Sequence, residues 1–343
     1  MGSKIFRRAA KRVMQHMAAR LGPHRRQTKT PRLLILMYHR ILPEGDPRTL
    51  TEEPGMMVTP QSLAMHLEVI RRHFEPIHLS QWLRHRRDGA PLPLKACAIT
   101  FDDGWADNYE FALPVLRAAG VPATVFLVSR LMGTGQTFWP ERLTDLLRRV
   151  ALERPEAFAM PEFDWLRSAG THFGFADLPP TPEQCYALIA HAKALADGEI
   201  HRRLDAIEAR LGLAEKLGPR ALLSWEQVRE MAANGLIEMG SHTRDHLRLD
   251  GHVAPDELEA QVVQSKAEIE THVGRPVELF CYPNGDYTAA ALDLVKRHYL
   301  GAVTTAQGWN SGQTDPALLR RIAVHEDIAG DEIAFAARIS GWV

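Results

Sequence analysis

The sequence predicts an α/β protein whose strands are parallel and form either an open sheet or a barrel. Short apolar, strand-like runs alternate with segments of helical periodicity, and most loops between them are short. The polar residues that could carry chemistry cluster directly after the strand-like runs. In parallel α/β folds this position is the carboxyl end of the strands, where ligands bind and catalytic residues lie.

The composition is that of an ordinary globular protein. The chain has 343 residues, 45% of them hydrophobic and 24% charged, with a formal net charge of −1. Nothing in this balance indicates a nucleic-acid partner. The three cysteines, Cys97, Cys185 and Cys281, are too scattered for a disulfide framework, so we expect buried thiols in a reducing compartment. No secretory signal is evident, and the predicted location is the cytoplasm.

Residues 1–31 are predicted to be a basic amphipathic extension and linker, ahead of a barrel that spans 32–343. Residues 4–21 have the pattern of a helix with an apolar face opposite a basic face. The apolar residues are Phe6, Ala10, Val13, Met14, Met17 and Leu21, and the basic ones are Lys4, Arg7, Arg8, Lys11 and Arg12. Such a helix could make a peripheral contact with the inner face of an anionic membrane, or it could be a solvated or docked terminal helix.

The first half of the barrel is expected to contain four strands. We expect them over 33–38, near 76–79, over 98–101 and over 123–128. Thr59-Pro60 begins a helix, because threonine caps a helix and proline suits its first turn. Another helix begins at Ser80, and Gly120 ends the helix between the last two strands.

Residues 130–220 interrupt the alternation. Helical periodicity recurs over 143–150, 188–196 and 204–211, with a stretch containing proline and phenylalanine between them. We interpret this segment as a helical insertion at one edge of the barrel, either a lid or a substrate-facing subdomain.

The alternation resumes at Ser224-Trp225-Glu226-Gln227, which has the form of a capping box. Strands are expected over 236–240, 279–282, 301–305 and 321–324. Helices are expected over 258–273 and 289–298, with a terminal helix from Asp331. The whole chain then contains seven or eight strand–helix units.

Two of these strand ends carry candidate metal ligands. Asp102-Asp103-Gly104 follows the strand at 98–101, where the carboxylates could be catalytic or could only form a turn. His242 and His246 are four residues apart, which would place both imidazoles on one side of a helical turn. With Asp103 they form a set of two histidines and one carboxylate, which is typical of catalytic zinc sites that keep a position for water.

These residues make the chain similar to the polysaccharide deacetylases of carbohydrate esterase family four, the NodB homology domain. Two family signatures stand here as Thr100-Phe101-Asp102-Asp103-Gly104 and Ser241-His242-Thr243-Arg244-Asp245-His246. The resemblance covers residues 33–325 and implies a distorted (β/α) barrel of seven or eight units. It also implies that Asp102 is the general base and that Asp103, His242 and His246 bind a divalent metal ion.

The third family signature departs from the usual pattern. Residues 279–285 read Leu-Phe-Cys-Tyr-Pro-Asn-Gly and lack the usual arginine, a form that resembles the poly-N-acetylglucosamine deacetylase branch. The backbone N–H of Tyr282 would then stabilise the oxyanion. Arg321 would replace the missing arginine and keep Asp102 ionised, unless it forms only a surface ion pair.

The general acid has two candidates. In this branch the acid histidine belongs to an early Tyr-His pair, which stands here as Tyr38-His39. The resemblance therefore favours His39 over His325, although His325 lies where the commoner family order places the acid.

The resemblance implies a metal-dependent hydrolase that removes an N-acetyl group from an amino sugar in a glycan or glycan precursor. Zinc is the expected metal, and cobalt, nickel and iron suit the same ligands. Trp105, Pro283 and Trp309 are the candidate substrate-binding residues, and Trp139 could also stack on a sugar ring, although tryptophans in these positions could equally be packing residues. The alternatives are a deformylase or O-deacetylase that acts on a lipid-linked sugar, and a catalytically silent carbohydrate-binding barrel.

Overall fold

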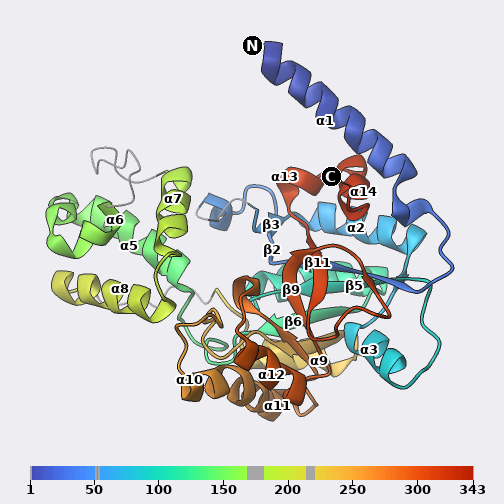
Figure 1. The fold of residues 1–343 in the computed structure, drawn as a ribbon. Helices are drawn as coiled ribbons and strands as arrows, with labels where there is room; N and C mark the ends of the chain where they lie inside the picture. The colour runs from blue at the N-terminus through green and yellow to red at the C-terminus, as the bar shows by residue number, and fades with distance from the viewer. Residues whose placement is uncertain (1, 51, 53–54, 168–180, 214–220, 343) are drawn as a thin grey trace. The chain divides into compact units, whose positions relative to one another are not determined.

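The structure is a computed structural model that describes residues 2–50, 52, 55–167, 181–213 and 221–342 (Figure 1). The chain divides into two compact units. The first unit contains residues 1–44, 55–134 and 222–343, and the second contains residues 45–54 and 135–221.

In the described part of the first unit, seven parallel strands close into a barrel, as the resemblance implies (Figure 1). In spatial order they are β1 (Arg32–Tyr38), β11 (Leu319–Ala323), β9 (Gly301–Gln307), β8 (Leu279–Cys281), β7 (Ile237–Ser241), β6 (Ala123–Leu127) and β5 (Lys95–Phe101), and β5 pairs again with β1. Two short strands extend the sheet, β4 (Glu75–Pro76) beside β5 and the antiparallel β10 (Asn310–Ser311) beside the start of β1. A separate pair consists of β2 (Arg40–Ile41) and β3 (Met57–Val58).

Helices surround the barrel (Figure 1). They are α2 (Pro60–His73), α3 (Leu79–Arg87), α4 (Leu113–Ala119), α9 (Trp225–Ala233), α10 (Pro255–Glu259), α11 (Ser265–Val273), α12 (Ala289–His298), α13 (Glu326–Ala329) and α14 (Glu332–Ile339). The predicted helix starts are confirmed, because the side chains of Thr59, Ser224 and Asp331 each accept a hydrogen bond from a first-turn backbone N–H. Gly120 ends α4 in the left-handed conformation, with φ of 64°.

Two of the outer helices contain a π-helical segment. One is η3 (Asn108–Ala112), which continues into α4, and the other is η6 (Ala260–Gln264), which joins α10 to α11. The single long helix predicted over 258–273 is therefore interrupted. A π-helical turn contains an extra residue and disturbs the regular hydrogen-bond ladder.

The N-terminal helix α1 (Gly2–Leu21) packs against α14. Ala18 and Ala19 form a small apolar cluster with Ala336 and Ala337. The structure does not describe the side chains of residues 2–9 and 11. The predicted places of Phe6 on the apolar face and of Lys4, Arg7, Arg8 and Lys11 on the basic face therefore lie outside the described residues. Among the described residues, no helix combines the length and the hydropathy needed to cross a bilayer.

The second unit is helical, as predicted for the insertion. Its helices are α5 (Trp139–Glu153), α6 (Asp164–Arg167), α7 (Pro182–Ala192) and α8 (Asp197–Leu211). Their apolar faces form one buried core, which includes Leu146, Leu188 and Leu204. Trp139 is buried in this core, so it packs in the protein interior and does not present a stacking surface.

Close packing between strands limits the side chains that the barrel accepts. Gly240 on β7 lies beside Phe126 on β6, and a Cβ atom at position 240 would lie 2.4 Å from a ring carbon of Phe126. The ring is fully buried and has little freedom to move away. Glycine is therefore needed at this position to allow the two strands to approach.

We predict that Gly240→Ala destabilises the protein by about 1–3 kcal/mol, the usual effect of overpacking a core. Gly251→Ala is the matched control, because a Cβ at position 251 would have no atom within 4 Å. The free energy of unfolding in urea measures both. Equal stability of the two variants would show that the barrel relaxes around the added methyl group.

Candidate active site

The predicted catalytic and metal-binding residues come together at the carboxyl ends of the barrel strands. His39 follows β1, Asp102 and Asp103 follow β5, and His242 follows β7. Pairing of β1 with β5 ends at Tyr38 and Phe101, so the next residues of both strands emerge side by side. Nε2 of His39 accordingly lies 3.8 Å from Oδ2 of Asp102.

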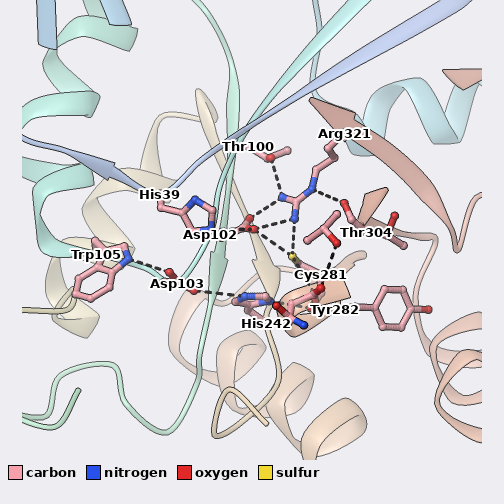
Figure 2. A network of polar contacts seen from close by, with 12 residues as sticks. His39, Thr100, Asp102, Asp103, Trp105, His242, Cys281, Tyr282, Thr304 and Arg321 are labelled. Atoms are coloured by element: carbon pink, nitrogen blue, oxygen red, sulfur yellow. Dashed lines mark hydrogen bonds and ion pairs between the residues drawn. The ribbon is translucent and has the colours of Figure 1, made fainter. Parts of the chain in front are cut away.

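Asp102 forms a buried ion pair with Arg321 of β11. The guanidinium donates to both carboxylate oxygens, over 2.7 Å to Oδ1 and 2.8 Å to Oδ2 (Figure 2). Arg321 also donates to the carbonyl of Thr304, to Oγ1 of Thr100 and to the sulfur of Cys281. Arg321 is only 1% exposed, so the surface ion pair considered from the sequence does not form.

This pairing decides the charge of Asp102. Burial alone would raise the pKa of the carboxyl group, but the charge and hydrogen bonds of Arg321 outweigh it and lower the pKa below its ordinary value. Asp102 is therefore a carboxylate at neutral pH, although it is almost fully buried. A buried carboxylate with one edge paired to arginine can still accept a proton from a group on its open side.

Asp103, His242 and His246 form a second group with ligand atoms that converge. Nε2 of His242 and Nε2 of His246 each lie 3.4 Å from Oδ1 of Asp103. The three ligand atoms are all within 4.8 Å of one another, which suits a metal ion with bonds of about 2.0–2.2 Å to nitrogen and oxygen. The group fits a divalent ion of the zinc type, and three protein ligands leave a coordination position for water.

Neighbouring groups orient these ligands. The indole N–H of Trp105 donates to Oδ2 of Asp103 over 2.9 Å, so Oδ1 is the oxygen that faces the histidines (Figure 2). Nδ1 of His242 bonds to the carbonyl of Cys281 over 2.8 Å. Because a carbonyl only accepts, Nδ1 carries the proton and Nε2 is left with its lone pair for a metal.

The two histidines do not lie on a helical turn, contrary to the interpretation of their spacing. Residues 242–246 form a loop in which Thr243 and His246 adopt left-handed backbone angles, with φ of 64° and 59°. The two imidazole rings nevertheless lie 4.9 Å apart, centroid to centroid. The two side chains are thus close together because of the path of a loop and not because of a helical turn, and their role as ligands stays a prediction.

The geometry places His39 beside the base and gives His325 another partner. Nδ1 of His325 faces Oδ2 of Asp327 over 3.6 Å, and burial lowers the pKa of this histidine despite that carboxylate. A histidine with a lowered pKa is less suited to enter a reaction protonated. This arrangement agrees with the preference for His39 as the acid, which stays a prediction.

The structure corrects the role expected of Tyr282. Its backbone N–H donates to the carbonyl of Val303 over 3.2 Å, as part of the pairing between β8 and β9. The donor expected for an oxyanion is therefore already used within the barrel. The tyrosine ring packs against Phe280 and Tyr287, away from Asp102 (Figure 2).

The two tryptophans expected to bind substrate do not do so in this arrangement. Trp105 is 1% exposed, with its ring under the guanidinium of Arg40 and its N–H on Asp103, so it orients a ligand. Trp309 lies beside β10, which pairs with the first residues of β1. β1 is seven residues long, so Trp309 lies about 20 Å from the site, at the opposite end of the barrel.

The remaining candidate for substrate binding is Pro283. It begins the short helix η7 (Pro283–Gly285) directly after β8, at the end of the barrel that carries the site, and it is buried. Its role stays a prediction.

Cys281 is a site residue that the sequence interpretation missed. Its sulfur lies 3.5 Å from Oδ2 of Asp102, and its carbonyl fixes the tautomer of His242. All three cysteines are buried free thiols, as expected, but only this one touches the base. Alternation along β8, with Phe280 and Tyr282 facing outward, would have indicated that Cys281 points into the barrel.

Comparison with known proteins agrees with this site. A family model described as polysaccharide deacetylase matches residues 89–159 and 196–303, which is more than half of the chain. The chain belongs to the polysaccharide deacetylase family and is a carbohydrate deacetylase by that membership.

Individual relatives add detail. YxkH of Bacillus subtilis (strain 168), which carries the name of a polysaccharide deacetylase, is 24% identical over 91% of this chain and 77% of its own length. A 50-residue segment, 15% of this chain, is 40% identical to the poly-beta-1,6-N-acetyl-D-glucosamine N-deacetylase of Escherichia coli (strain K12), of which it covers 7%. The fold is similar to the Streptococcus pyogenes deacetylase PplD in complex with acetate, with a TM-score of 0.57 and 17% identity over 90% of this chain and 99% of that one.

We predict that Arg321→Met moves the acid limb of the pH–activity profile to higher pH. The variant removes the charge that lowers the pKa of Asp102 but keeps the burial that raises it, so the carboxylate protonates at a higher pH. Breaking the buried pair should also destabilise the protein by about 3–5 kcal/mol. Arg321→Lys keeps the charge and should shift the limb less.

Arg320→Met is the matched control, because Arg320 is the exposed neighbour on the same strand. Rates measured between pH 4 and pH 9, with the metal content of each variant determined in parallel, separate loss of the pair from loss of metal. An unchanged acid limb in Arg321→Met would show that this arginine does not set the protonation of the base.

Proposed function

We propose that this protein is a metal-dependent N-deacetylase that removes acetyl groups from N-acetylated amino sugars in a glycan or glycan precursor. One observation carries the proposal. The side chains of Asp103, His242 and His246 form a group that can hold a metal ion. The residue directly before Asp103 in the chain, Asp102, is a buried carboxylate that Arg321 keeps ionised, and it lies 3.8 Å from His39.

The residues of the site have separate roles in this reaction. Asp102 accepts the proton released when water attacks the acetamide carbon, and Arg321 keeps it ionised for that step. His39 donates a proton to the amine as the carbon–nitrogen bond breaks, so acetate and a free amino sugar leave. Asp103, His242 and His246 would hold the ion, which when bound lowers the pKa of a water molecule and polarises the acetamide carbonyl. Zinc suits these ligands best, with cobalt, nickel and iron as alternatives.

The relatives support the substrate class. The Escherichia coli relative acts, by its name, on poly-beta-1,6-N-acetyl-D-glucosamine, and the structurally similar Streptococcus pyogenes deacetylase binds acetate, which is the product expected here. We therefore propose N-acetylglucosamine oligomers as the first substrates to test.

The test measures acetate release from N-acetylglucosamine oligomers by protein that has been stripped of metal and then given Zn²⁺. We expect Asp102→Asn to lose turnover but keep bound zinc, since Asp102 is not one of the three ligands. His242→Ala should lose both. His39→Ala should lose most activity, whereas His325→Ala should keep most of it.

The outcomes discriminate between the alternatives. Near-normal activity of Asp102→Asn would refute its role as the base. If the wild-type protein binds zinc but releases no acetate, formylated, O-acetylated and lipid-linked sugars are the next substrates, and failure on all of them would indicate a silent carbohydrate-binding barrel.

We also propose that α1 makes a peripheral contact with an anionic lipid surface. Val13 is 60% exposed, and Met14, Met17 and Leu21 are each 55% exposed, so one stripe of the helix has no covering. Residues 1–26 contain eight lysine and arginine residues and no aspartate or glutamate, although the whole chain has a net charge of −1. An apolar stripe within a basic segment is complementary to anionic lipid headgroups.

The direction of α1 is set by its contacts with α14. Arg12 pairs with Asp331 at the start of α14, and Gly22 lies against Ser340 at its end, so the two helices run parallel.

We predict that the protein cosediments with phosphatidylglycerol vesicles at low salt and that Met17→Glu abolishes this binding. Leu152→Glu is the matched control, since Leu152 is 73% exposed and lies in the other unit. Binding should weaken at high salt and be absent with phosphatidylcholine. A dimer that Met17→Glu dissociates, without any vesicle binding, would instead assign the stripe to contact between two copies.

A further inference from the structure

The fully buried side chain of Gln261 lies against the loop that carries the two histidines. Gln261 belongs to η6, the π-helical segment between α10 and α11, and it is 0% exposed. A buried amide needs partners for two donor hydrogens and an acceptor oxygen, or its burial is costly. All of these partners are present around Gln261.

Gln261 makes four hydrogen bonds. Its Oε1 accepts from the backbone N–H groups of Arg244 and Asp245, over 3.0 and 2.9 Å. Its Nε2 donates to carboxylate oxygens of Asp245 and Glu257, over 2.7 Å each. The amide can have only this orientation, because the two backbone groups only donate and the two carboxylates only accept.

The two backbone groups that Gln261 binds are in the middle of the histidine loop. They lie between Thr243 and His246, the two residues with left-handed backbone angles. Each such residue costs about 1–2 kcal/mol relative to a right-handed conformation. A loop with two such residues, one of which is His246 itself, needs outside contacts to stay in this form.

The first residue of α11, directly after η6, holds the start of the loop. Oγ of Ser265 lies 2.7 Å from Oγ of Ser241, the residue directly before His242. The hydroxyl of Tyr299 donates to the carbonyl of Val262 over 2.7 Å, and Oγ of Ser265 lies 2.8 Å from the carbonyl of Gln261, so these two carbonyls of the irregular turn have a partner. Gln261 of η6 and Ser265 of α11 thus contact the loop at two points.

We propose that Gln261 is a positioning residue that sets the geometry of the metal site by holding the backbone between His242 and His246. The proposal rests on the metal site proposed above. Gln261 touches neither a ligand atom nor the base. It acts indirectly, because its hydrogen bonds fix the path of the loop that carries the two histidines.

The test uses Gln261→Glu and Gln261→Met in the full-length protein. Glutamate keeps the acceptor for the two N–H groups but places a third carboxylate beside Asp245 and Glu257. Methionine keeps the approximate volume and removes all four hydrogen bonds. Gln264→Met is the matched control, because Gln264 belongs to the same π-helical segment and is exposed.

Zn²⁺ affinity is measured by competition with a chromophoric chelator, and ligand geometry by the visible absorption of the Co²⁺-substituted protein. We expect both Gln261 variants to bind Zn²⁺ about 10–100-fold more weakly, the usual effect of losing an outer partner of a metal site, with a changed Co²⁺ spectrum. Gln264→Met should match the wild type in both. The double variant Gln261→Glu/Glu257→Gln should recover affinity, because the amide of the new glutamine can donate to the new carboxylate.

Wild-type affinity and an unchanged Co²⁺ spectrum in both Gln261 variants would overturn the positioning role and leave the proposed function intact. Loss of affinity without recovery in the double variant would assign the effect to general disruption of the fold and would also overturn it. If the wild-type protein binds neither Zn²⁺ nor Co²⁺, the metal site itself is refuted, and the role of Gln261 with it.

Discussion

The pairing of β1 with β5 is the constraint on which the candidate site depends. Seven consecutive residues of each strand pair in register, and this contact closes the sheet into a barrel. In an open sheet the same two strands could be far apart, and His39 would have no fixed relation to Asp102. Closure makes the ends of both strands neighbours, and the backbone N–H of Asp102 donates to the carbonyl of Tyr38 over 2.9 Å. A histidine and a carboxylate from distant parts of the chain thus meet at one point.

Barrel closure also explains how an ionised carboxylate can be buried. β11 is the other neighbour of β1, so Arg321 can reach Asp102 through the barrel interior. A buried ion pair rarely adds much stability, because both groups lose their hydration. Here the donors of Arg321 that do not bind the carboxylate are taken by Thr304, Thr100 and Cys281. The result is a fixed negative charge next to a group that can hold a metal ion.

Much of this arrangement could be predicted from the sequence, because strands, helix caps and the two family signatures are local patterns. The errors concern the direction of side chains and the path of the backbone. Residue type alone indicates sugar stacking for Trp105 and Trp309, and the family resemblance indicates an oxyanion donor at Tyr282. Their actual roles depend on the loop between β9 and β10, which returns to the far end of the barrel, and on the ladder between β8 and β9. Neither feature produces a periodic pattern in the sequence, so neither could be predicted from it.

The distribution of backbone strain shows where the fold is specialised for function. Among the described residues, the non-glycine residues with positive φ are Asp103, Thr243, His246 and Asn284. All four follow β5, β7 or β8, at the end of the barrel where the ligands converge. Strain of this kind persists only where surrounding contacts impose it. Side chains outside the strands provide those contacts: the indole N–H of Trp105 donates to Asp103, and the side chain of Gln261 accepts from the backbone N–H of Arg244. The geometry of the site is thus imposed by the surrounding fold, because the local preferences of its own residues oppose it.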